Sequence, residues 1–208
     1  GKGKSSDCHF RSYRAEKTYA VTNGKWYFEV EILSKGLIKT GWATLNFTPS
    51  RELGRDEHSW SFDCNLSRKF HADASESFGK PVNYGDIIGC FLDLNDRTIG
   101  FSLNGELLLD ASGGELAFTD IAVSNESFVP AITLGVGQKV RLIFGQDVNS
   151  LKCFTACGLQ DGYQPFCINM NRNMSLWYNK DEPLFMDVKE NNSNVFNKIT
   201  SFSKSKQK

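Results

Sequence analysis

The sequence predicts an all-β protein, an antiparallel two-sheet β-sandwich of the jelly-roll type with a C-terminal extension packed on it. The composition combines 16 Phe, 6 Tyr and 4 Trp with 18 Gly and only 5 Pro, which is typical of a turn-rich β protein. Short apolar segments alternate with period two, and no helical periodicity lies between them. Two stacked sheets would bury the alternating aromatic side chains between them.

Two Asn-Gly pairs predict tight hairpin turns, because both residues tolerate the positive φ angles of a type I′ turn. After Asn23-Gly24, apolar residues at every second position share one face of a strand. Before Asn104-Gly105, Ile99, Phe101 and Leu103 alternate with small or polar neighbours. The two pairs therefore predict strands at residues 18–21, 25–33, 97–103 and 106–110.

Alternation elsewhere predicts further strands, and its absence predicts a long loop. Residues 46–84 show few apolar alternations and many polar side chains, so we expect them to be mostly loop on the rim of the sandwich. A short helix is predicted at residues 147–154. The additional strands are expected at residues 39–44, 59–62, 86–94, 128–134 and 139–144.

Changes in composition and apolar patterning along the chain predict four regions. Residues 1–9 are expected to be flexible, 10–145 to form the sandwich, 146–188 to pack on it, and 189–208, which are polar, to be disordered. The third region holds scattered aromatic residues suited to packing across a sheet edge, namely Tyr163, Phe166, Trp177, Tyr178 and Phe185.

Charge and hydropathy limit the classes of partner. The chain has 24 Lys+Arg against 24 Asp+Glu, whereas nucleic-acid-binding domains carry a basic excess, so we do not expect nucleic acid as the partner. No apolar stretch approaches the roughly 20 residues of a membrane-spanning helix, and no signal peptide is visible. We therefore expect no direct membrane insertion. Because nothing in the sequence demands a dimer face, we also expect the isolated chain to be a monomer.

Cysteines and glycosylation sequons favour different compartments. The six cysteines are best interpreted as reduced thiols, because their spacing fits neither a zinc knuckle nor a redox pair and a chain of 208 residues folds without disulfides. Five Asn-x-Ser/Thr sequons keep a second hypothesis open, that of a secreted sugar-binding lectin.

No catalytic, cofactor or metal site is predicted. His58 and His71 share a polar segment with Asp63 and Cys64, but their spacing fits no known ligand pattern. Residues 93–98 begin like a calcium-binding loop, yet Arg97 stands where an oxygen ligand is needed. We interpret residues 93–98 as a tight turn between two strands.

The segment 46–84 also holds the residues that we expect to bind a partner. Large aromatic and cationic side chains lie close together there, and such side chains are enriched at interface hot spots; an arginine can also hold a partner carboxylate with two hydrogen bonds. The alternative is that Trp60, Phe62 and Phe70 turn inward and tether the loop to the sandwich. The candidate partner-binding residues are Trp60, Arg68, Lys69, Phe70, His71 and Lys80.

Three stretches together resemble the SPRY domain family, whose fold is a concanavalin-like sandwich. They are residues 26–30 (WYFEV), 84–93 (YGDIIGCFLD) running into 101–105 (FSLNG), and 128–131 (FVPA). Further segments, at 52–54, 78–81, 145–148 and 157–163, resemble the second of the three SPRY domains of ryanodine receptors, over roughly residues 10–186.

This resemblance implies a non-catalytic protein-interaction module of a homotetrameric intracellular calcium-release channel, with contacts that tune gating. Its place would be the cytosolic face of the sarcoplasmic or endoplasmic reticulum membrane. The implied partners are other domains of the same channel and, as a further candidate, a membrane or regulatory protein.

Overall fold

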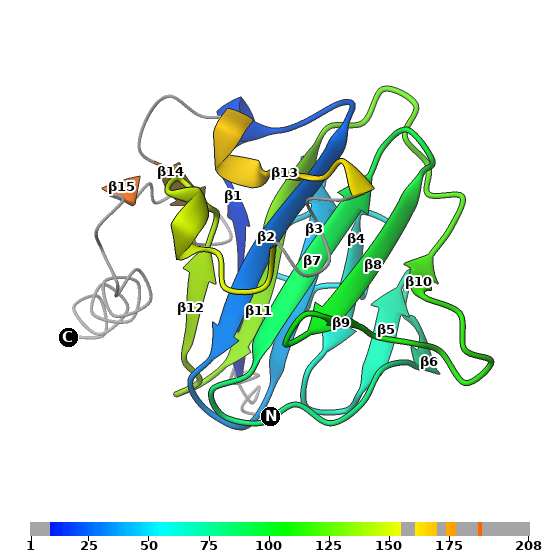
Figure 1. The fold of residues 1–208 in the computed structure, drawn as a ribbon, viewed down its shortest axis with the longest axis vertical. Helices are drawn as coiled ribbons and strands as arrows, with labels where there is room; N and C mark the ends of the chain where they lie inside the picture. Colours follow the sequence, from blue (N-terminus) through cyan, green and yellow to red (C-terminus); the bar gives the residue numbers. More distant parts are fainter. Residues whose placement is uncertain (1–8, 155–160, 170–173, 178–186, 189–208) are drawn as a thin grey trace, which may run out of the picture.

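The computed structural model describes residues 9–154, 161–169, 174–177 and 187–188, and two antiparallel sheets stack face to face in it (Figure 1). Sheet A has the strand order β15-β14-β1-β11-β3-β4-β5-β6. Its strands, in chain order, are β1 (Phe10–Ala15), β3 (Ile38–Thr44), β4 (Ser59–Asp63), β5 (Arg68–His71), β6 (Ala74–Ser77), β11 (Phe128–Gly135), β14 (Met174–Trp177) and β15 (Asp187–Val188).

Sheet B has the order β10-β8-β7-β2-β12 and lies in front of sheet A in Figure 1. Two short strands, β9 (Glu106–Leu107) and β13 (Gln164–Pro165), pair with β8 and β2 respectively. The other strands are β2 (Lys25–Ile32), β7 (Ile87–Asp93), β8 (Thr98–Leu103), β10 (Leu116–Phe118) and β12 (Val140–Ile143). The predicted fold class, an antiparallel two-sheet sandwich, is confirmed.

The core lies between the sheets and is built from aromatic side chains of both. Phe28 of β2 meets Trp42 of β3 edge-on, with 5.1 Å between ring centroids. Phe62 of β4 lies 5.7 Å from Phe101 of β8. All four side chains are fully buried. The period-two alternation of their strands places each of them on the inner face.

The Asn104-Gly105 hairpin is confirmed, whereas the hairpin predicted at Asn23-Gly24 is wrong. Asn104 and Gly105 have φ angles of 51° and 87°, and Leu103 pairs with Glu106. Residues 18–21 do not return along β2. A 3₁₀ helix, η1 (Lys17–Tyr19), forms there because the Glu16 carboxylate accepts the Thr18 N–H at 3.0 Å. Val21 then makes an isolated bridge to Phe128 in sheet A.

The prediction that residues 46–84 are mostly loop is wrong for their second half. Besides the expected strand β4, this segment contains β5 and β6, which form a hairpin at the edge of sheet A. The turn between them consists of Ala72 and Asp73, with φ angles of 49° and 65°. Neither residue favours positive φ as strongly as Asn-Gly, and β6 carries no large apolar side chain, so the sequence pattern did not reveal this hairpin.

Part of the C-terminal region packs on sheet B. We call residues 148–154 and 161–167 the strap. The helix expected at 147–154 is reduced, up to residue 153, to one 3₁₀ turn, η2 (Val148–Ser150). Residues 151–153 leave the helix, and the N–H groups of Lys152 and Cys153 donate instead to the Glu29 carboxylate, at 2.8 and 2.7 Å.

Apolar contacts hold the strap at both ends. Phe154 lies 5.2 Å from Tyr27 on the outer face of sheet B, and Tyr163 meets Phe91 on the same face at 5.0 Å. Phe166, in the 3₁₀ helix η4 (Phe166–Asn169), reaches the inter-sheet core and lies 6.0 Å from Trp42. The strap is therefore part of the packed domain.

Some predictions fall on residues that the structure does not describe. These are the flexible segment up to residue 8, the tail 189–208, and the packing of Tyr178 and Phe185. Trp177 is described only as backbone, in β14 next to β1. Within the described part of the chain, no helix has the length and apolar character needed to cross a membrane.

We predict that Glu29→Gln destabilises the fold. Glu29 is fully buried and accepts from Tyr27 as well as from the two strap N–H groups. An amide in its place would turn an NH₂ group toward a donor, and the free energy of unfolding should fall by about 1–3 kcal/mol in urea titrations.

Glu31→Gln is the matched control. Glu31 lies two residues along the same face and forms ion pairs with Arg141 and Lys152 that are partly exposed. Its loss should cost less than about 1 kcal/mol. Equal effects of the two substitutions would contradict the role assigned to Glu29.

Candidate functional site

A pocket of about 600 Å³ opens at one end of the sandwich, between the two sheets. Its walls come from the end of β3, the start of β4, the end of β5 and the connection from β10 to β11. The lining residues are Thr44, Glu57, His58, Trp60, His71, Ala72, Phe118, Thr119, Asp120, Ile121, Ala122 and Glu126. Strand pairing in sheet A thus forms one wall of the pocket. Sheet B and the β10–β11 connection form the opposite wall.

Trp60 and His71 form the aromatic floor of the pocket. They are partners in the β4–β5 register, and their rings stack with 4.6 Å between centroids and 9° between planes. Trp60 is 4% exposed and also packs against Phe128 in the core, at 5.6 Å. Phe118 meets the His71 ring edge-on, at 6.1 Å. The floor is therefore rigid and continuous with the hydrophobic core.

One hydrogen bond fixes the tautomer of neutral His71. Its Nδ1 lies 2.9 Å from the carbonyl oxygen of Ser59. A carbonyl oxygen only accepts, so Nδ1 must carry the hydrogen, and Nε2 of the neutral ring is a free acceptor. No described residue hydrogen-bonds to Nε2, which leaves this nitrogen available at the pocket.

Carboxylates supply the charge of the lining. Asp120 forms an exposed ion pair with Arg97 at 3.5 Å. Glu57 is exposed and Glu126 half-buried, and neither side chain has an ion-pair or hydrogen-bond partner within the described part of the chain. The lining contains three acidic residues and neither lysine nor arginine among the residues described.

Strand alternation divides the candidate partner-binding residues between the two faces of sheet A. His71 and Lys69 pair with Trp60 and Phe62, whose side chains point into the core, so they lie on the inner face. Phe70 and Arg68 consequently lie on the outer face. The structure therefore does not place the run from Arg68 to His71 on a single surface, and of the six candidates only Trp60 and His71 line the pocket.

The remaining candidates make contacts within the domain. Lys69 donates to the Ala117 carbonyl of sheet B at 2.7 Å and so ties the two sheets together beside the pocket. Arg68 donates to Ser75 of the edge strand β6 at 3.1 Å. Lys80 is 54% exposed and pairs with Glu106 at 3.0 Å. Lys80 is thus the most accessible of the six, but it lies outside the pocket.

Phe70 covers a charged cluster on the outer face of sheet A. The Lys39 ammonium is 1% exposed, lies 3.3 Å from the Glu52 carboxylate and sits 3.7 Å from the centroid of the Phe70 ring. Burial lowers the pKa of Lys39, although the carboxylates of Glu52 and Asp63 oppose the shift. Burial likewise raises the pKa of Asp63. Phe70, which is 4% exposed, is thus buried against this cluster on the outer face of sheet A rather than available to a partner.

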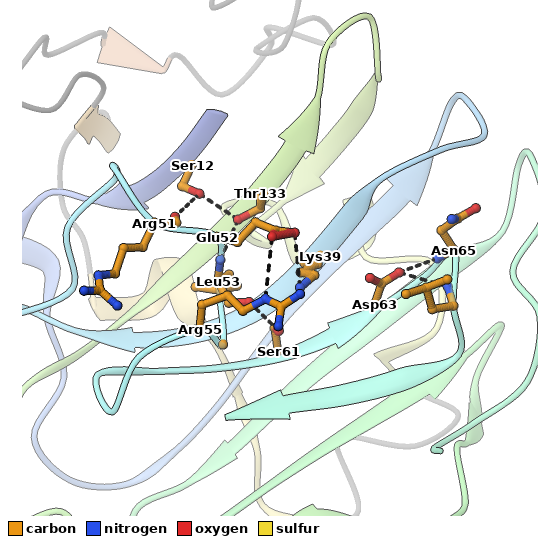
Figure 2. Close-up of polar contacts among 12 residues, drawn as sticks. Ser12, Lys39, Arg51, Glu52, Leu53, Arg55, Ser61, Asp63, Asn65 and Thr133 are labelled. Carbon is orange, nitrogen blue, oxygen red and sulfur yellow. Dashed lines mark hydrogen bonds and ion pairs between the residues drawn. The ribbon is translucent and has the colours of Figure 1, made fainter. Parts of the chain in front are cut away.

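The same cluster holds the loop 47–56 against sheet A, as Figure 2 shows. The Ser12 hydroxyl donates to the Arg51 carbonyl at 2.6 Å, and the Leu53 N–H donates to the Thr133 hydroxyl at 2.8 Å. The Ser61 hydroxyl donates to the Leu53 carbonyl at 2.9 Å. This loop ends next to Glu57 and His58, so its anchoring positions one rim of the pocket.

The turn predicted at residues 93–98 is confirmed. The Asp93 carboxylate accepts the N–H groups of Asn95 and Asp96 at 2.9 and 3.0 Å, and the Lys25 ammonium lies 3.4 Å from its other oxygen. No group of three His, Cys, Asp or Glu residues suited to a metal ion occurs in the part of the chain that the structure describes.

Sequence reasoning missed Glu57 and the wall formed by residues 118–126. That wall follows Trp60 by more than fifty residues and carries no motif, so only the packing of sheet B against sheet A brings it to the pocket. Two non-glycine residues with positive φ, Asp120 (53°) and Asn125 (58°), shape it. A single sequence gives no signal for these conformations beyond a weak preference of Asp and Asn.

We predict that Gly54→Ala displaces the loop 47–56. Gly54 has a φ of +87°, and a Cβ there would lie 2.5 Å from the Phe70 Cβ and 2.6 Å from the Ser61 hydroxyl. Gly113 has the same φ with nothing within 4 Å. Gly113→Ala should lower the free energy of unfolding by about 1–2 kcal/mol, and Gly54→Ala by about 1–3 kcal/mol more. Equal losses in denaturant titrations would show that the loop is not packed as described.

Comparison with known proteins places this geometry in a family. Residues 25–147, more than half of the chain, match the SPRY domain. The E3 ubiquitin-protein ligase RKP of Arabidopsis thaliana is 36% identical over 140 residues, which cover 65% of this chain and 10% of the ligase.

Two RNA helicases are also similar to this chain. The probable ATP-dependent RNA helicase ddx1 of Dictyostelium discoideum is 33% identical, and the ATP-dependent RNA helicase DDX1 of Xenopus laevis 35% identical, each over 89 residues. These matches cover 43% of this chain and 11% and 12% of the helicases. The chain spans about a tenth of the length of these curated relatives. With its two-sheet sandwich and its match over residues 25–147, the chain belongs to the SPRY domain family, a family of non-catalytic interaction domains.

Proposed function

We propose that this SPRY domain binds a segment of a partner protein in the pocket between its sheets. The observation that carries the proposal is the pocket of about 600 Å³ with a rigid aromatic floor and polar groups that lack partners within the described chain. Its volume falls in the range of roughly 300–1,000 Å³ that ligand sites occupy. Rigid walls favour binding because little side-chain entropy is lost on association.

The relatives support an interaction role for the shared region. One carries the name of a ubiquitin ligase and two carry the name of RNA helicases, while the region similar to this chain covers 10–12% of each. Since these names denote different activities, the similar region is better explained as a recognition module than as the part that performs either of them.

We further propose that the domain belongs to the cytosolic assembly of a ryanodine-receptor-type calcium-release channel, on the sarcoplasmic or endoplasmic reticulum membrane. The motifs at 52–54, 78–81, 145–148 and 157–163 support this placement by their resemblance to the second SPRY domain of those channels. The partner would then be another domain of the same tetramer or a membrane or regulatory protein. Its contacts would tune gating only if they differ between closed and open states.

Lysine cross-linking on the native full-length protein tests both proposals. Lys35 and Lys80 are exposed and should form cross-links, whereas Lys39 should stay unlinked because its ammonium is buried. Mass spectrometry of the same sample identifies the polypeptide that is contiguous with this chain. A ligase or a helicase in that position would overturn the channel proposal.

The pocket itself is tested by filling it. Ala122 is exposed and lines the pocket, so Ala122→Trp should block the partner while the melting temperature stays nearly unchanged. Ala111→Trp, at another exposed position, is the matched control. We expect cross-links from Lys80 to the partner to disappear in the first variant alone. Their persistence in Ala122→Trp would refute binding through the pocket.

A further inference from the structure

We infer that the pocket accepts a cationic side chain of the partner, and specifically an arginine. This inference rests on the proposed function, because it names the chemistry of the segment that would occupy the pocket. It is carried by three features of the lining: carboxylates without partners in the described chain, a histidine nitrogen held as an acceptor, and flat aromatic walls.

The charges of the pocket complement a cation. Glu57 and Glu126 lie on walls that come from different parts of the chain, and neither carboxylate has a partner among the described residues. Asp120 already forms an ion pair with Arg97. A ligand carboxylate or phosphate would meet like charge in this pocket, whereas a guanidinium could pair with either glutamate through two parallel hydrogen bonds.

His71 adds an acceptor at the floor in its neutral form. Its Nδ1–H is donated to the Ser59 carbonyl at 2.9 Å, so that Nε2 of the neutral ring can only accept. The stack on Trp60 holds the ring plane in place. The floor therefore selects a hydrogen-bond donor, as the carboxylates do.

The shape of the walls favours arginine over lysine. The Trp60–His71 stack and the edge of Phe118 present planar surfaces, and a planar guanidinium packs on such surfaces while donating from its rim. Lysine offers a compact, strongly hydrated charge that would have to lose more water. The volume exceeds that of one side chain, so the pocket also has room for a neighbouring residue of the partner segment.

The inference is tested with small probes on the isotope-labelled 208-residue chain. N-acetyl-arginine-N′-methylamide should shift the NMR signals of Trp60, His71 and Asp120. The citrulline analogue, which has nearly the same shape but no charge, should leave them in place. Glu57→Gln and Glu126→Gln should each weaken arginine binding about two- to fivefold, and Glu115→Gln, an exposed acid outside the pocket, should not.

His71→Phe examines the floor separately. Phenylalanine keeps a flat ring on Trp60 but lacks the acceptor, so arginine binding should weaken several-fold while the citrulline analogue still does not bind. Equal shifts by arginine and citrulline, or arginine shifts that do not depend on Glu57 and Glu126, would overturn the inference. If Ala122→Trp abolishes partner cross-links but arginine does not bind, the proposed function stands and the arginine inference fails.

Discussion

Packing of aromatic rings between the two sheets is the interaction on which the fold, the strap and the pocket all depend. Trp42 lies at its centre, because it contacts Phe28 of the opposite sheet and Phe166 of the strap. The same layer continues through Trp60 to His71, where it meets solvent. The pocket floor is thus the exposed end of the core, and a change that loosens the core near Trp60 should also deform the pocket.

The segment around the pocket shows what sequence patterns could predict and where they failed. The strands at 59–62 and 97–103 were predicted correctly because apolar residues alternate there. The run from Arg68 to His71 was interpreted as one surface since it was assigned to a loop. Once it is a strand, period two divides it, and Phe70 and Lys69 turn to opposite faces.

The rest of the pocket could not be predicted from the sequence, for a different reason. Its second wall, residues 118–126, is brought to Trp60 by the stacking of two sheets rather than by local pairing, and single-sequence patterns report only local pairing. The anchoring of the loop 47–56 could not be predicted from the sequence either. It depends on Lys39, whose ammonium is buried between Glu52 and the ring of Phe70, and a lysine in an alternating segment ordinarily indicates a solvent-facing position.

The two covering segments explain why recognition is expected between the sheets. The loop 47–56 lies on the outer face of sheet A and is held by Glu52 and by serine and threonine hydroxyls. The first part of the strap lies on the outer face of sheet B and is held by Glu29. Over these areas, aromatic side chains such as Phe70 and Tyr27 are already buried within the domain. At the mouth of the pocket the aromatic layer ends without such a cover from the described residues, and acceptors without partners surround it. A partner that supplies a planar side chain rich in hydrogen-bond donors would satisfy those acceptors. The same side chain would pack against the exposed end of the aromatic layer.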